Sequence, residues 1–175
     1  ATEERSARKE EDWPNGSNSP VYTAHYYGIL GPIGTNPVTG SAYKAGGRSE
    51  SYGGYSEEGV LWQFSSRIGD IKDGTSNTLM VGEISWAPMS KYRAWIRGKY
   101  QSSSGVLYLL SKNVEFPINS GDETLWNSVA FGSEHPGGAQ FLLGDGSCRL
   151  VSETIDFDTY LGYCSRNGGE VPGEL

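Results

Sequence analysis

The residues closest to a catalytic arrangement are His135 and Asp145, with Ser133 and Ser147 beside them in the chain. A nucleophilic serine needs a base within hydrogen-bond reach and a third group that orients the base. The sequence has no G-x-S-x-G elbow to present such a serine. Turn chemistry accounts for both candidates, because His135 precedes a Pro-Gly-Gly run and Asp145 precedes Gly146. We therefore expect no catalytic residue here and no enzyme activity.

A second group of side chains could hold a hard cation. Asp70, Asp73, Thr75 and Asn77 place several oxygens close together in the chain, and Ca²⁺ takes roughly six to eight oxygen ligands. The spacing differs from that of an EF-hand loop, and Glu83 could join only if the fold returned it to this loop. The alternative is an Asx-type turn in which these oxygens bind nearby backbone. We favour the turn and keep Ca²⁺ at Asp70, Asp73 and Asn77 as the metal hypothesis.

An aromatic and basic stretch runs from residue 86 to residue 100 and includes Trp86, Tyr92 and Trp95. Such aromatic side chains stack on sugars, and they also fill cores and protein interfaces. Nucleic acid is disfavoured as a partner, because a formal net charge of -7 repels phosphates. The stretch predicts a core and subunit contact first, and a carbohydrate-binding surface second.

A glycine-rich, β-prone chain must carry these candidates. Gly accounts for 25 of the 175 residues and aromatic residues for 12%, a mixture that suits a turn-rich sheet better than a helical bundle. We predict an α+β fold, mainly an antiparallel β-sheet with long Gly-rich loops, of which residues 31–58 are the longest. We expect residues 1–20 to form a charged N-terminal arm and residues 21–175 to form one domain.

The strongest local signal is a β-hairpin in the second half of the chain. Ala139–Leu143 is an apolar strand, Cys148–Val151 returns beside it, and Asp145-Gly146 lies between them. Asp-Gly between two apolar runs indicates a tight turn, because both residues tolerate positive φ. A two-residue loop would pair Leu143 with Cys148, and a slip of one residue would exchange the two faces of the hairpin.

Four shorter elements complete the expected organisation. Leu79–Ser85 is the clearest central strand, and Val60–Phe64 is a shorter one. We expect Thr124–Ala130 to form one helical turn. Asp158–Tyr163 is expected to form a short helix after the hairpin.

Three motifs together resemble those of a known family. His135, nine intervening residues and then Asp145-Gly146 are similar to the H-x9-D-G motif of a large family of secreted, pilin-like proteins. Residues 69–78, which include I-K-D-G-T-S-N-T, and the following Gly82-Glu83 resemble the central segment of that family. Gly162–Val171 resembles its closing segment. The three motifs occur in the family's order over the second half of the chain.

The resemblance implies the globular head of a pilin-like protein. Its members carry a prepilin-type N-terminal helix, whereas no apolar run here approaches the roughly 18–20 residues that span a bilayer. That helix would have been removed, proteolysed or supplied by a separate helix-bearing chain. The implied function is a non-enzymatic structural subunit of an extracellular pilus-like filament or a type II secretion-type pseudopilus, with other pilin-like subunits as partners. The alternative is a secreted module that binds carbohydrate or matrix through Trp86, Tyr92 and Trp95.

The chain contains two cysteines, Cys148 and Cys164. The secreted location that the resemblance implies favours one disulfide between them, worth about 3 kcal/mol. The alternative is a pair of buried free thiols. The sequence has no C-x-x-C pair and two histidines, so we do not expect a zinc site, and we expect no cofactor.

Overall fold

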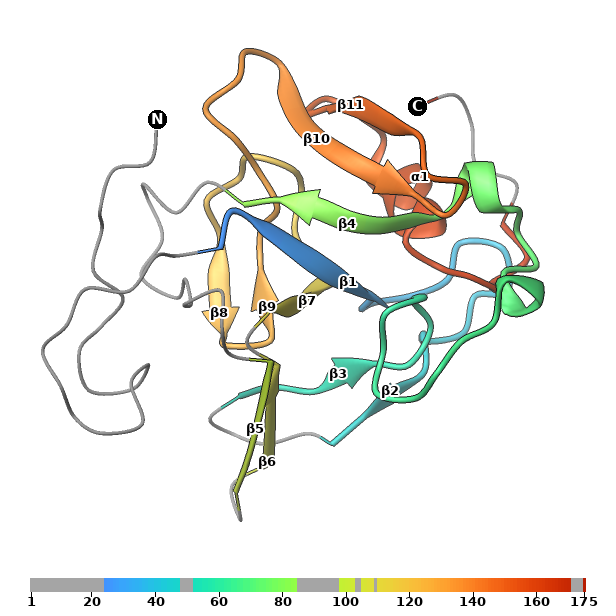
Figure 1. Ribbon diagram of the computed structural model, residues 1–175, viewed down its shortest axis with the longest axis vertical. Helices are drawn as coiled ribbons and strands as arrows, with labels where there is room; N and C mark the ends of the chain where they lie inside the picture. Colours follow the sequence, from blue (N-terminus) through green and yellow to red (C-terminus); the bar gives the residue numbers. More distant parts are fainter. Residues whose placement is uncertain (1–23, 48–51, 85–97, 103–104, 109, 171–174) are drawn as a thin grey trace, which may run out of the picture.

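A computed structural model describes residues 24–47, 52–84, 98–102, 105–108, 110–170 and 175. Within these ranges the chain forms short strands, two single 3-10 turns and one α-helix (Figure 1). The elements are β1 (Tyr26–Pro32), β2 (Ala45–Gly46), β3 (Tyr55–Ser56), η1 (Ile68–Asp70), η2 (Thr75–Asn77), β4 (Leu79–Glu83), β5 (Lys99–Ser102), β6 (Gly105–Tyr108), β7 (Ser111–Val114), β8 (Glu123–Leu125), β9 (Ser128–Val129), β10 (Gly138–Leu143), β11 (Cys148–Ser152) and α1 (Phe157–Tyr163).

The main sheet is mixed rather than mainly antiparallel. Its seven strands lie in the order β11-β10-β4-β1-β7-β9-β8. The pairs β1–β7 and β7–β9 are parallel, whereas the other four pairs are antiparallel. Strands β2 and β3 form a separate two-stranded sheet, as do β5 and β6. The α+β description roughly fits, but the prediction of a mainly antiparallel sheet is wrong.

The error arises at β7, because its sequence is polar although the strand is buried. Lys112 and Asn113 are each 1% exposed. The Lys112 ammonium donates to the backbone oxygens of Tyr108 (2.8 Å) and Trp126 (2.6 Å). The Asn113 side chain accepts from the Ser56 amide (2.8 Å) and donates to the Gly54 carbonyl (2.9 Å). A polar strand that bonds to neighbouring loops has no apolar pattern by which the sequence could reveal it.

The hairpin is confirmed as β10 and β11, but its expected register is wrong by one residue. Cys148 lies opposite Leu142, not Leu143. The loop has three residues, because the Leu143 amide donates to the Ser147 carbonyl (2.9 Å) and the Gly146 amide to the Leu143 carbonyl (3.0 Å). Gly146 has φ 86°, as the third residue of such a loop requires.

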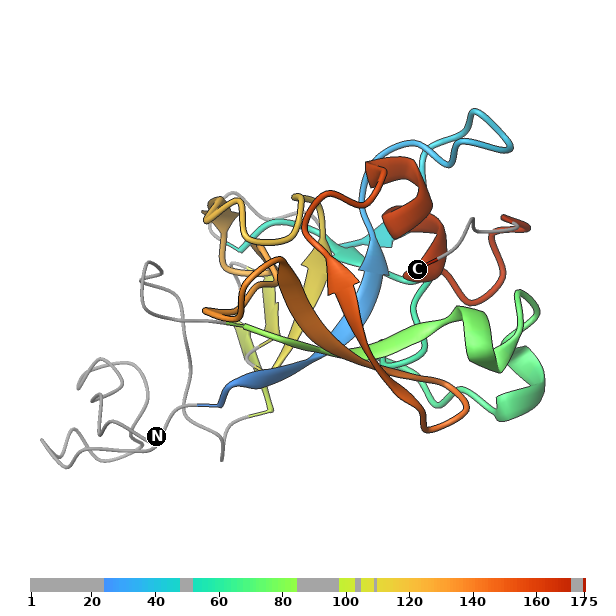
Figure 2. The ribbon, with the colours of Figure 1, turned by 90° about the horizontal axis from the view of Figure 1, so that it is seen from above.

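The hydrophobic core lies between the sheet and α1 (Figure 2). Ala139, Phe141 and Leu143 of β10 point into it and are at most 1% exposed. The Phe141 ring contacts the ring of Tyr160 in α1, with centroids 5.9 Å apart. Asp156 caps α1 by accepting from the Thr159 amide (2.9 Å), a hydrogen bond that lowers the pKa of the Asp156 carboxyl. The predicted helix at Asp158–Tyr163 is confirmed.

Two of the shorter expected elements are wrong. Val60–Phe64 consists of bends and not of a strand. Thr124–Ala130 contains parts of β8 and β9 joined by a turn, and not a helical turn. The central strand expected at Leu79–Ser85 is present as β4. In the part of the chain that the structure describes, no helix is both long and apolar enough to cross a membrane.

Candidate functional site

The H-x9-D-G motif spans β10, and its two polar residues do not meet. His135 precedes this strand of six residues and Asp145 follows it, so roughly 20 Å of strand separates them. The His135 side chain instead lies 3.4 Å from the carboxylate of Glu83, at the end of β4. Glu83 also accepts from the Gln140 amide (3.2 Å). The motif histidine and the Gly82-Glu83 motif therefore contact each other at one end of the hairpin.

Asp145 holds the turn at the other end. Its carboxylate accepts from the Ser147 amide (2.8 Å) and hydroxyl (2.6 Å), and these bonds lower the pKa of the Asp145 carboxyl. Its amide donates to the Thr75 carbonyl (3.0 Å), and the Gly144 amide donates to the Thr78 carbonyl (2.8 Å). The Asp-Gly turn therefore docks on the D-G-T-S-N-T segment.

Asp73 connects that segment to the closing motif. Its carboxylate accepts from the amides of Gly168 (2.8 Å) and Gly169 (3.1 Å). Asp70 accepts from the Arg67 amide within its own turn (2.7 Å), and Asn77 donates to the Asp73 carbonyl (3.2 Å). Among the described residues, no three His, Cys, Asp or Glu side chains gather in a way that could hold a metal ion. Asp70 and Asn77 bind nearby backbone, as in the Asx-type turn, whereas Asp73 binds the backbone of a distant segment.

Arg166 supports the same junction from the closing segment. Its guanidinium donates to the carbonyls of Glu57 and Gly59, at 2.6 Å each. The guanidinium also lies 5.0 Å from the centre of the Trp62 ring, within cation–π range. The loop before η1 is thereby attached to the chain after α1.

A buried carboxylate, Glu170, completes the junction. It is 6% exposed, and its Oε1 accepts from the Tyr43 hydroxyl (2.6 Å) and the Asn36 amide group (2.8 Å). Its Oε2 has no hydrogen-bond partner among the described residues. Burial raises the pKa of the Glu170 carboxyl, an effect that the hydrogen bond from Tyr43 opposes. We call Asp73, Arg166, Gly168, Gly169 and Glu170 the C-terminal junction. Sequence reasoning identified the glycines and Asp73 through motifs but missed the role of Arg166.

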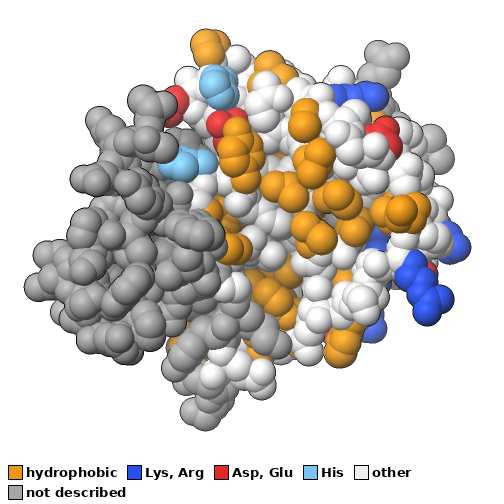
Figure 3. All heavy atoms as spheres, in the orientation of Figure 1, with side chains coloured by type: hydrophobic (Ala, Val, Ile, Leu, Met, Phe, Trp, Pro, Cys, Tyr) orange, Lys and Arg blue, Asp and Glu red, His pale blue; other side chains and the backbone are white. Residues whose placement is uncertain are grey.

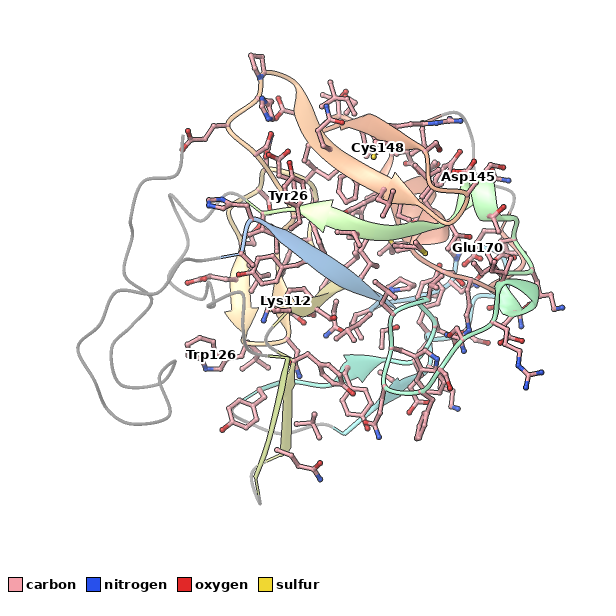
Figure 4. All side chains as sticks on the ribbon, viewed as in Figure 1. Tyr26, Lys112, Trp126, Asp145, Cys148 and Glu170 are labelled. Carbon is pink, nitrogen blue, oxygen red and sulfur yellow. The ribbon has the colours of Figure 1, made fainter. Side chains whose placement is uncertain are left out.

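The opposite side of the sheet carries apolar side chains that are half-buried or exposed, and Leu61 covers part of it at Gly28. We call it the outer face, because its side chains point away from α1. Figure 3 shows apolar side chains gathered over it, and Figure 4 labels Tyr26 and Cys148 on two of its strands. Tyr26 is 59% and Leu150 is 49% exposed. The face comprises Tyr26 of β1, Val81 of β4, Gln140 and Leu142 of β10, and Cys148 and Leu150 of β11.

The outer face carries almost no free charge. Glu83 is its one acidic residue in these four strands, and His135 and the Gln140 amide already bind its carboxylate. A contiguous apolar area on a soluble domain usually marks a contact with another molecule. The chemistry of this face suits contact with an apolar surface better than contact with a charged ligand.

The cysteine pairing and the aromatic stretch have different outcomes. The predicted disulfide is absent, because Cys148 is an exposed residue of the sheet edge whereas Cys164 is buried beneath the sheet at the end of α1. Burial raises the pKa of the Cys164 thiol well above its usual value. Trp86, Tyr92 and Trp95 lie outside the described residues.

Comparison with protein families places most of the chain in one of them. The comparisons with curated proteins and with solved structures each found no match. Residues 14–158 match the model of a family described as a protein of unknown function, DUF1559. That match includes the H-x9-D-G motif, the central segment and every strand of the main sheet. The chain belongs to this family.

Proposed function

We propose that this chain is a non-enzymatic structural subunit of an extracellular, pilus-like assembly, as the pilin-like resemblance of its motifs implies. The observation that carries the proposal is the outer face. Four neighbouring strands present apolar side chains there, of which Tyr26 is 59% and Leu150 is 49% exposed. Subunit contacts are made by apolar surfaces of this kind, with polar residues at the rim.

The contacts that the motif residues make support a structural role. His135, Asp145 and Asp73 bind other groups of the same chain. These contacts hold the two ends of the hairpin and the C-terminal junction in place. A head held in one shape suits a subunit that repeats the same contact in a symmetric assembly.

The experiment uses surface material sheared from cells that produce the protein. Tyr26→Lys and Leu142→Lys each place a charge on the outer face, and both are expected to remove filaments from negative-stain electron micrographs. Val38→Lys is the matched control, because Val38 is 63% exposed but lies in the loop after β1. Thermal unfolding of each purified variant checks that the fold survives. Normal filaments in both outer-face variants would refute the proposal.

A further inference from the structure

The main sheet ends in a bare strand edge at β11. This strand pairs with β10 over five consecutive residues and occupies the last position in the strand order. No described residue pairs with its other side, and Cys148, Arg149 and Leu150 are exposed (Figure 1). An unpaired edge is a template for another strand.

The hydrogen bonds of the hairpin show which backbone groups are free. The Ser147 carbonyl accepts from the Leu143 amide (2.9 Å), and the Glu153 amide donates to the Gly137 carbonyl (3.0 Å). Both odd-numbered residues thus turn their groups toward β10. Because successive residues of a strand direct their amides and carbonyls to opposite sides, Cys148 and Leu150 direct both groups outward. The Ser152 amide also points outward, whereas the Ser152 carbonyl accepts from the Ile155 amide (3.2 Å).

The edge lacks two of the devices that normally prevent pairing. β11 contains no proline, and its register with β10 is free of bulges. Arg149 is its one charged residue and lies opposite Phe141, on the side of the sheet that faces α1. An inward-facing charge disfavours most partner strands, so this edge is open to a strand that offers an acidic residue there.

The charged residues near this edge in one copy complement those in a second copy. Arg149 of β11 and Glu153, the first residue of the turn after β11, are exposed and lie four residues apart, and both are opposite residues of the β10 side of the hairpin, Phe141 and Gly137. If two copies of β11 run antiparallel with Val151 opposite Val151, each Arg149 lies opposite the Glu153 of the other copy. The Asn119 amide group binds Oε2 of Glu153 at 2.7 Å, which leaves the other oxygen available for the arginine.

We propose that β11 pairs antiparallel with β11 of a second copy of this chain, about a two-fold axis at Val151. The two main sheets then form one continuous sheet, and the two Arg149–Glu153 pairs set the register. This dimer uses the strand edge, whereas the proposed function uses the outer face. Loss of filaments in Tyr26→Lys with the dimer intact, or the reverse, therefore separates the two proposals.

Sedimentation velocity over a range of protein concentrations tests the dimer. The wild-type chain is expected to dimerise, and Arg149→Glu and Glu153→Arg are each expected to raise the dimer Kd roughly tenfold, because each creates two like-charge cross-strand pairs. The double variant R149E/E153R restores both pairs and is expected to recover the wild-type Kd. Arg67→Glu is the matched charge reversal at an exposed residue of another region.

A nitroxide attached to Cys148 tests the register, since Cys164 is buried and unreactive while the protein is folded. The proposed axis places the two Cys148 Cα atoms about 20 Å apart, at six residues of strand rise. A monomer at every concentration would overturn the proposal. So would a double variant as weak as the single ones, or a Cys148 separation that differs from this value by more than the reach of the label.

Discussion

The two faces of β10 are built from one strand but meet different surroundings. Ala139, Phe141 and Leu143 point toward α1 and are buried. Gln140 and Leu142 point to the outer face and are half-buried. Leu142 is as apolar as Leu143, so the difference lies in what covers each face. α1 covers one face, whereas Leu61 covers the other only at Gly28 of β1 among the contacts of the described residues.

The motif residues explain how the covered face is kept in place. His135 and Asp145 hold the two ends of the hairpin, through Glu83 and through Thr75. Asp73 then holds the segment that follows α1. The motifs therefore stabilise the covered face.

The sharpest test of the comparison uses the two cysteines. Cys148 lies on the outer face, whereas Cys164 is completely buried and burial raises the pKa of its thiol. A thiol reagent is expected to modify Cys148 at once. It should modify Cys164 at least roughly a thousand-fold more slowly, because that reaction requires opening of the fold. Intact-mass spectrometry should show one label on the native protein and two after denaturation. Resistance of both cysteines without a reductant would restore the predicted disulfide.

The sequence was sufficient where local chemistry decides the structure. Asp145-Gly146 predicted the hairpin, and the apolar pattern predicted β4 and α1. It failed at β7, where Lys112 and Asn113 are buried because distant backbone groups bind them. The hairpin register predicted from the sequence is also wrong. The loop has three residues, and its Gly144 and Asp145 contact the segment around η2. Parallel pairing between β1 and β7 depends on tertiary contacts that no local pattern encodes.

The candidate site was predictable only in part for the same reason. The motifs marked His135, Asp73 and the glycines of the closing segment, but their spacing did not reveal the partners of those residues. The outer face follows from the period-two alternation once the register is known. With the expected register, Leu143 and Cys148 would have shared a face. Each face of the hairpin would then have been assigned both buried and exposed residues.

The largest stability effect is expected on the covered face. Phe141→Ala removes a ring that contacts the rings of Phe131 (5.8 Å) and Tyr160 (5.9 Å). The loss of buried area and the resulting cavity should lower the free energy of unfolding by about 3–5 kcal/mol. Urea unfolding followed by fluorescence measures it. The control is Leu142→Ala on the outer face, and a loss there as large as that for Phe141→Ala would show that the outer face is also part of the core.

A smaller loss is expected at the C-terminal junction. Asp73→Ala deprives the Gly168 and Gly169 amides of their acceptor, and should cost about 1–2 kcal/mol of unfolding free energy. Asp70→Ala is the matched control, since Asp70 binds only within its own turn. Hydrogen exchange at Gly168 and Gly169 should accelerate in the first variant alone. Unchanged exchange there would mean that Asp73 does not hold this loop.

Glu170 should make the free energy of unfolding fall as the pH rises, whereas the carboxylates of the exposed turns should make it rise. Its pKa is raised in the fold by burial, so the folded state binds the proton more tightly than the unfolded chain. Its contribution is greatest below its ordinary pKa of about 4.3, and it declines as the pH rises through the raised value. Glu170→Gln removes this decline, so the variant should lose less stability than the wild type between pH 4 and pH 7.5. Glu134→Gln, at an exposed site, should leave the wild-type profile unchanged.

The smallest effect on stability is expected at Leu150. This residue gives the most demanding test of the difference between the two faces. The side chain is half in solvent, so Leu150→Lys in the isolated chain should change the unfolding free energy by no more than about 0.5 kcal/mol. The same substitution places an ammonium group in the outer face at β11 and should weaken association, since the charge must be desolvated when that face is covered. Urea unfolding at low protein concentration measures the first quantity, and sedimentation at high concentration the second. A variant that unfolds easily but associates normally would show that Leu150 belongs to the interior of the head, and the outer face would then end at Leu142.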